Sequence, residues 1–164
     1  MTKIVGIDPG VSGALAYVDT GSGYVDLIDM PIAHVGKTKL VDGLAVATWL
    51  TSRRPDVVVL EHVGPQPTDG KVGAFTFGGM FGSAYGIATA LGFNVKLVRP
   101  QLWKTKLGLN KDKARSMKRA LQLYPDASPL LYGPRGGAKV DRAEALLMAH
   151  WETLQNAPTS TMVH

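Results

Sequence analysis

Four carboxylates stand at positions from which they can act together. Asp8 ends a short apolar run and is followed by Pro9 and Gly10, and Glu61 ends a second apolar run. Both runs are rich in β-branched residues, which indicates buried strands. An acid at the end of such a strand is costly to desolvate unless a positive charge lies beside it. If the two strands are central and parallel, their carboxyl ends lie about 5 Å apart in an adjacent pair.

The other two acids, Asp141 and Glu144, open the last predicted helix and share one of its faces, because they are three residues apart. Simpler interpretations exist: Asp8 can cap a turn, and the helical pair can stabilise the positive helix N-terminus. Four carboxylates in one place would repel one another, and two divalent cations would relieve that repulsion. Ligation by oxygen alone suits Mg²⁺ or Mn²⁺. Two such ions about 4 Å apart promote phosphodiester hydrolysis.

The composition favours an anionic partner and excludes several kinds of site. The chain of 164 residues carries a net charge of +5 and has a pI of about 9.5, which favours nucleic acid. It contains no cysteine, so disulfides and cysteine-based zinc sites are excluded. No run of about eighteen apolar residues is present, so we expect no membrane span. The N-terminus enters a strand without a signal peptide, which predicts a cytoplasmic protein of a bacterial cell or a phage-infected host.

The order of the predicted elements is typical of an α/β protein with a mixed five-stranded sheet. Three strands form an antiparallel meander, and the later strands alternate with helices, which indicates parallel crossover units with helices on both faces. We expect one domain over residues 1–155 and a flexible tail over 156–164. The expected strands cover 4–8, 14–18, 24–30, 56–61 and 94–98, and the expected helices 40–53, 79–91, 100–104, 111–123 and 139–154. Loops are expected over 32–39, most of 62–79, and 125–138.

Three acidic motifs, in this order, resemble those of the RuvC-type Holliday junction resolvases of the ribonuclease-H-like superfamily. They are IVGIDPG at residues 4–10, LE at 60–61 and DRAEAL at 141–146, so the resemblance spans nearly the whole chain. In the bacterial enzymes the last acidic pair is commonly two Asp, or His and Asp, whereas this chain has the longer Glu144. The short chain and residues 100–104 look more like phage-encoded relatives.

The resemblance implies a divalent-metal-dependent endodeoxyribonuclease that cuts four-way junctions by paired nicks from a homodimer. It implies two Mg²⁺ ions per active site, with Mn²⁺ as a substitute, and no nucleotide cofactor. The implied metal ligands are Asp8, Glu61, Asp141 and Glu144. The same four acids would be catalytic together with Lys113, near the scissile phosphate. For the contact between the two copies we expect the helix over 79–91, which is rich in Gly, Ala and Met.

Basic and aromatic residues outside the acidic motifs are candidates for DNA contacts. Phe75 and Phe77 can stack on an unpaired base or, equally, fill the core beneath their loop. The basic candidates can hold backbone phosphates, or they can form a solvated basic face, since five basic residues lie within 111–119. These candidates are Lys71, Lys104, Lys111, Lys113, Arg135 and Lys139. The tryptophans, Trp103 among them, are expected to anchor the core.

Other functions stay open beside a junction resolvase. An ATP-binding protein of the actin and sugar-kinase type has a similar opening motif, but it needs two such domains and a much longer chain. A non-catalytic junction-binding protein would gain nothing from negative charge concentrated near phosphates. An enzyme acting on RNA or hybrids is not excluded, since no residue clearly reads a 2′-hydroxyl. A broader nuclease for branched DNA, such as forks and flaps, is the nearest alternative.

Overall fold

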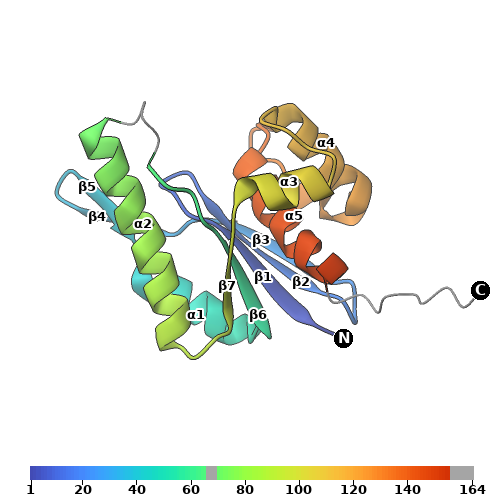
Figure 1. Cartoon of the computed structure of the whole chain (residues 1–164), viewed down its shortest axis with the longest axis horizontal. Coiled ribbons are helices and arrows are strands. Elements are labelled where there is room, and N and C mark those ends of the chain that lie inside the picture. Colours follow the sequence, from blue (N-terminus) through green and yellow to red (C-terminus); the bar gives the residue numbers. More distant parts are fainter. Residues whose placement is uncertain (66–69, 156–164) are drawn as a thin grey trace, which may run out of the picture.

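The structure is a computed structural model that describes residues 1–65 and 70–155. Within these residues the centre is a mixed five-stranded sheet (Figure 1) made of β1 (Lys3–Asp8), β2 (Ala14–Asp19), β3 (Val25–Asp29), β6 (Val57–Glu61) and β7 (Val95–Val98). The strand order is β3-β2-β1-β6-β7. Strands β1 to β3 pair antiparallel, whereas β6 runs parallel to both β1 and β7. The expected mixed sheet is confirmed.

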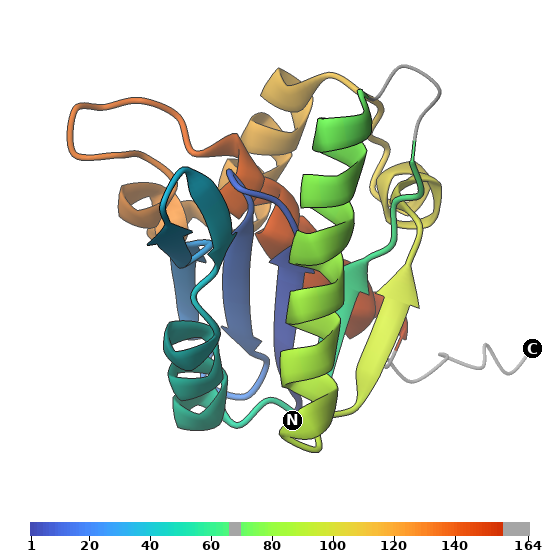
Figure 2. The ribbon, with the colours of Figure 1, turned by 90° about the vertical axis from the view of Figure 1, so that its left-hand side faces the viewer.

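Helices cover both faces of this sheet, as expected. In Figure 2 one face carries α1 (Gly43–Arg53) and α2 (Lys71–Ala90), which lie in front of the strands. The opposite face carries α3 (Pro100–Lys106), α4 (Lys113–Leu123), the short 3-10 helix η1 (Pro125–Leu130) and α5 (Val140–Gln155). Helix η1 lies in a stretch that was expected to be a loop. None of the helices in the described part of the chain is both long and apolar enough to cross a membrane.

Alternation along the two central strands decides where their terminal acids point. In β1, Ile4 belongs to the apolar cluster packed against α5, and Val5 belongs to the cluster under α1 and α2. Because successive side chains alternate between faces, Asp8 projects to the α5 side. In β6, Val59 belongs to the α5-side cluster, so Glu61 projects to that side as well. The sheet therefore directs both acids to one face.

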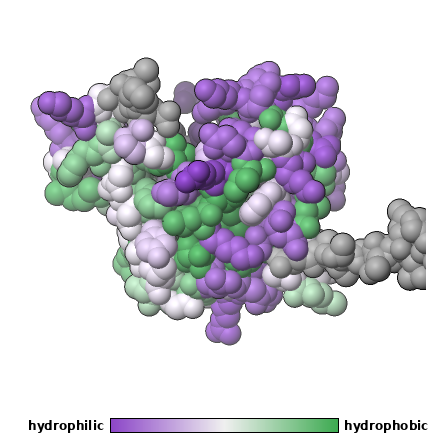
Figure 3. Space-filling view, viewed as in Figure 1, coloured by the Kyte–Doolittle hydropathy of each residue, from purple (hydrophilic) through white to green (hydrophobic). Residues whose placement is uncertain are grey.

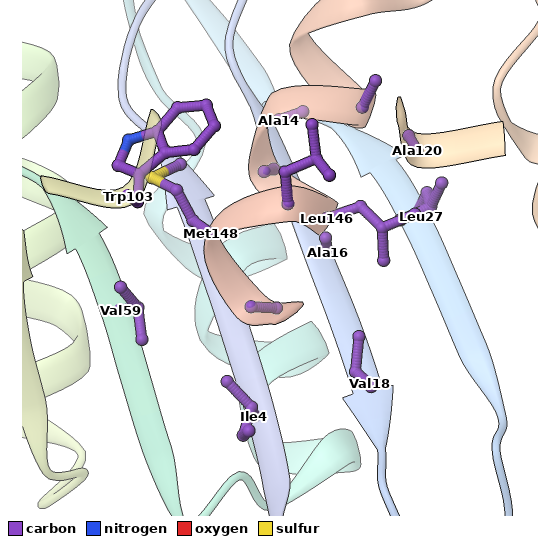
Figure 4. Packing of buried hydrophobic residues seen from close by; sticks show 14 of the residues in the cluster. Ile4, Ala14, Ala16, Val18, Leu27, Val59, Trp103, Ala120, Leu146 and Met148 are labelled. Carbon is purple, nitrogen blue, oxygen red and sulfur yellow. The ribbon is translucent and has the colours of Figure 1, made fainter. Parts of the chain in front are cut away.

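Helix α5 can lie close to β1 because β1 presents no side chain at Gly6. A Cβ atom on Gly6 would lie 2.1 Å from the carbonyl oxygen of Ala145 and 2.9 Å from the backbone nitrogen of Ala149. Strand β2 contributes the short side chains of Ala14 and Ala16, which are seen beneath α5 in Figure 4. The backbone of α5 therefore approaches the sheet directly, and the first turns of α5 reach the end of β1.

The segment after β3 is a hairpin, so the loop expected over residues 32–39 is wrong. Strands β4 (Ile32–Val35) and β5 (Thr38–Val41) form a separate two-stranded sheet beside α2. Helix α1 accordingly begins after Asp42, whose side chain caps it by accepting a hydrogen bond from the backbone N–H of Ala45 at 3.0 Å, and not at residue 40. Leu40 misled the prediction because its spacing from Leu44 fits a helix, although it pairs with β4.

Helix α2 is longer than expected, since it begins at Lys71 rather than near residue 79. Several glycines between residues 73 and 79 indicated irregular chain, because each glycine costs a helix about 1 kcal/mol relative to alanine. Burial of Met80, Ala84 and Ala88 against the sheet outweighs that cost. The loop residues 66–69 and the tail 156–164, expected to be irregular and flexible, lie outside the described residues.

The contact at Gly6 gives a first prediction. Gly6→Ala should lower the free energy of unfolding by about 3 kcal/mol or more, because the added methyl group meets helix backbone that cannot rotate away. Urea unfolding followed by circular dichroism measures this loss. Gly10→Ala is the matched control, since the nearest atom to its new Cβ lies 3.8 Å away. Equal stability of the two variants would show that α5 does not rest on β1 as described.

Candidate active site

Three of the four predicted acids meet where β1 ends. One carboxylate oxygen from each of Asp8, Asp141 and Glu144 lies within 4.8 Å of the others. Asp8 is the last residue of β1, and the other two come from the first turns of α5. Glu144 is buried, whereas Asp8 and Asp141 are partly exposed. Glu61 is not part of this group of three, but it ends the neighbouring strand β6 on the same face, and its charge acts on Asp8.

The first turn of α5 is held in place by an acid that the sequence analysis did not single out. Asp29, at the end of β3, accepts hydrogen bonds from Lys139 Nζ at 2.8 Å and from Arg142 Nε at 2.7 Å. Arg142 also donates from Nη1 to the carbonyl oxygen of Leu130 at 2.8 Å. Lys139 and Arg142 flank Asp141 in sequence, so these contacts set the rotation of α5 that turns Asp141 toward Asp8.

Donors from α3 and α4 surround the acids on the other side. Lys104 Nζ lies 3.0 Å from Glu144 Oε1, and Lys113 Nζ lies 3.3 Å from Asp141 Oδ1. Lys113 was predicted to lie near the scissile phosphate and Lys104 to contact DNA, and both lie beside the acidic cluster. Two further donors were missed: the indole N–H of Trp103 donates to Glu61 at 3.1 Å, and the hydroxyl of Ser116 donates to Glu144 at 3.2 Å.

Burial and mutual repulsion make the acidic cluster costly to ionise. Burial, followed by the charges of Glu61, Asp141 and Glu144, raises the pKa of Asp8 well above its ordinary value of 3.8, and Lys113 only partly opposes this. Burial likewise raises the pKa of Glu61. The charge of Asp141 raises the pKa of Lys113, which keeps that lysine protonated. The cluster is therefore an environment that favours an added positive charge.

A cavity of about 440 Å³ opens beside the acids. It is lined by Asp8, Asp141, the turn over residues 9–13, and Thr76 and Phe77 of α2. Phe77 thus lies next to the acidic cluster, whereas Phe75, two residues earlier in α2, is 85% exposed. Neither ring fills the core: Phe75 is exposed, and Phe77 belongs to neither of the two apolar clusters of the described residues.

The remaining predicted DNA contacts gather around the same end of the sheet. Lys71 begins α2, Lys111 precedes α4, and Arg135 lies in the loop before α5; all three are exposed. In Figure 2 these segments all lie at the end of the sheet where β1 and β6 stop. Figure 3 shows a mostly hydrophilic surface over α4. Lys139 differs from the others because it is paired with Asp29.

The donor set fits a divalent magnesium-type cation. The group of three consists of carboxylates alone, and all-oxygen ligation suits Mg²⁺ and Mn²⁺ rather than zinc or copper. Burial and the charges of the neighbouring acids raise the pKa of Asp8, so a cation at this point would stabilise the ionised acids. A divalent cation is therefore the group that this arrangement accommodates.

Comparison with solved structures identifies the fold. Thermus thermophilus RuvC matches with a TM-score of 0.65 and 18% identity, over 94% of this chain and 96% of that chain. T. thermophilus RuvC in complex with Holliday junction substrate matches with a TM-score of 0.65 and 17% identity, over 96% and 98%. The yeast mitochondrial Holliday junction resolvase Ydc2 matches with a TM-score of 0.58 and 11% identity, over 94% and 82%. Sequence comparison finds no matching family model and no matching curated protein. The expected ribonuclease-H-like fold of RuvC is confirmed.

The raised pKa of Asp8 predicts that the acidic cluster destabilises the metal-free protein. Below pH 3.8, the ordinary pKa of an aspartate, the Asp8 carboxyl is protonated in both the folded and the unfolded chain. Between that pH and the higher pKa of the folded state, Asp8 ionises only in the unfolded chain. The free energy of unfolding therefore falls as the pH rises through this range. Asp8→Asn, which cannot ionise, should therefore resist urea better than wild type at pH 7.5 in EDTA, with a smaller difference at pH 5.

The control for this measurement is Asp126→Asn, which removes an exposed acid of η1 outside the cluster. That variant should follow the wild-type stability at both pH values. A stability of Asp8→Asn equal to or below that of wild type at pH 7.5 would contradict the described electrostatics.

Proposed function

We propose that this chain is a divalent-metal-dependent endodeoxyribonuclease that resolves four-way DNA junctions. The observation that carries the proposal is the meeting of Asp8, Asp141 and Glu144 within 4.8 Å of one another, at the carboxyl end of the central strand of a chain with net charge +5. The RuvC-like fold supports it, since a RuvC of this fold has been solved with Holliday junction substrate. The cytosol of a bacterial cell or a phage-infected host would be its place of action.

The acids and the lysines have separate roles in this proposal. Asp8, Asp141 and Glu144, with Glu61 beside them, would hold two Mg²⁺ or Mn²⁺ ions. Bound there, the ions supply an activated water and charge stabilisation for the leaving oxygen of a phosphodiester. Lys113 has a largely exposed side chain, so it can turn from Asp141 to a phosphate oxygen of the DNA.

The cavity next to Asp8 is suited to the nucleotide that carries the scissile phosphate. Phe77 lines that cavity, so a base that has left its stack can rest on the ring. Phe75, Lys71 and Arg135 lie on exposed surface at the same end and would contact the arms of the junction. Exposed cations such as these contribute to affinity without reading sequence.

A homodimer fits both the substrate and one surface of this chain. A four-way junction has two-fold symmetry, so paired nicks require two sites related by the same symmetry. Residues 72–90 of α2 contain no charged side chain, although Gly82, Ser83 and Gly86 are exposed on the outer side. Figure 3, which views α2 from the side, shows mostly white and green residues along this helix. A second copy can approach it closely without charge repulsion, whereas DNA finds no cation there.

The test of the proposed function is cleavage of synthetic DNA. Wild type should place paired nicks in a four-way junction with Mg²⁺ or Mn²⁺ and none in EDTA, and Asp8→Asn should lose at least about 10³-fold in rate while still binding the junction. A splayed fork, a flap, a linear duplex and an RNA–DNA hybrid are assayed in parallel. Forks cut as fast as junctions would redefine the enzyme as a broader branched-DNA nuclease. Tight junction binding without any cleavage would leave a non-catalytic binding protein.

The proposed dimer is tested separately by mass in solution. Light scattering at micromolar concentration should give twice the 17.5 kDa mass of one chain. Ser83→Glu should shift the protein to the single-chain mass, because two like charges would face each other across the symmetry axis. Thr51→Glu, which places the same charge on exposed α1, should remain dimeric. A wild type with the single-chain mass would refute the dimer.

A further inference from the structure

Two buried side chains, Trp103 of α3 and Ser116 of α4, have polar groups that reach the acidic site. Both residues are fully buried, and each makes its side-chain hydrogen bond to a glutamate of the site: Trp103 to Glu61 and Ser116 to Glu144. Neither residue belongs to the acidic motifs. The inference drawn from them rests on the proposed metal-dependent function.

The position of Trp103 combines packing with hydrogen bonding. Its ring lies beside Met148 of α5 in Figure 4, so its orientation is fixed by the core. The indole N–H is the only polar group of tryptophan and is a donor only, and here it points to Oε1 of Glu61 at 3.1 Å. A rigid, buried donor of this kind restricts the glutamate to one orientation.

Ser116 occupies a position where α4 packs against α5 and where its neighbours are apolar. Met117 and Ala120 of the same helix are buried in the α5-side cluster. A buried hydroxyl needs a partner, and Ser116 finds it in Oε1 of Glu144 at 3.2 Å. The long side chain of Glu144 has one more rotatable bond than an aspartate, so this contact removes freedom that an aspartate would not have.

All hydrogen bonds that the described residues donate to these two glutamates go to one oxygen of each. Glu61 accepts through Oε1 from Trp103, and Glu144 accepts through Oε1 from both Ser116 and Lys104. The Oε2 atoms accept none of these bonds. The donors of α3 and α4 thus hold each carboxylate by one side and leave its other oxygen available.

We propose that Trp103 and Ser116 are positioning residues, which fix Glu61 and Glu144 through Oε1 so that Oε2 of each can ligate a divalent cation. Helices α3 and α4 then have a defined part in the site: they orient the two long acids, while β1 and the start of α5 present the two short ones. Removal of either donor weakens cation binding because the glutamate must be ordered at the time of binding.

Binding of Mn²⁺ to the DNA-free protein, followed by the electron paramagnetic resonance signal of free Mn²⁺, tests this inference. Ser116→Ala and Trp103→Phe should each weaken Mn²⁺ binding by about ten-fold. Met117→Ala is the matched control, because it removes buried volume from α4 but no donor to an acid; it should lower the melting temperature and leave Mn²⁺ affinity unchanged.

A double-mutant cycle separates positioning from general damage to the fold. In a Glu144→Asp background the shorter carboxylate should no longer reach Ser116, so adding Ser116→Ala there should change Mn²⁺ affinity less than about two-fold. The difference between this small effect and the roughly ten-fold effect in the wild-type background measures the coupling between the two residues. Unchanged affinity of Ser116→Ala in the wild-type background, or an equal loss in both backgrounds, would overturn the positioning role alone. Wild-type protein that fails to bind Mn²⁺ would overturn the proposed function and this inference together.

Discussion

The close approach of α5 to β1 at Gly6 is the constraint on which the site depends. The helix backbone occupies the space that any side chain at that position would need, so the first turns of α5 reach the end of the central strand. Asp29 then sets the rotation of α5 through Lys139 and Arg142. Distance from the sheet and rotation about the helix axis together decide that Asp141 and Glu144 face Asp8. The acidic cluster thus results from backbone packing together with the ion pairs that Asp29 makes to Lys139 and Arg142.

The cluster also illustrates how a fold can hold acids that repel one another. Burial and neighbouring charge raise the pKa of Asp8, so the arrangement opposes folding when it is considered alone. Two lysines, an indole and a hydroxyl from α3 and α4 interact with the acids and offset part of that cost. The core clusters on the two faces of the sheet supply the rest. Strained functional groups of this kind persist where surrounding packing determines their positions.

The sequence predicted the acids and the sheet because their signals are local. Asp8 and Glu61 end β-branched runs, and Asp141 and Glu144 stand three residues apart at the start of the last helix. Hydrogen-bond partners that come from other elements leave no local pattern in the sequence. Trp103 lies 42 residues from Glu61, and Lys139 lies 110 residues from Asp29, so only tertiary packing brings these pairs together. The start of α2 and the β4–β5 hairpin were misassigned because glycine content and the Leu40 spacing are ambiguous until tertiary contacts decide between helix, strand and loop.

Because two of the four acids lie on α5, the last helix, the acidic cluster can form only late in the synthesis of the chain. A chain growing on the ribosome carries Asp8 and Glu61 long before Asp141 and Glu144 exist, and α5 must then emerge and dock on β1 and β2. Nascent and prematurely terminated chains therefore lack the complete cluster. The proposed nuclease activity would in this way require a chain that is synthesised to the end of α5 and has closed its core.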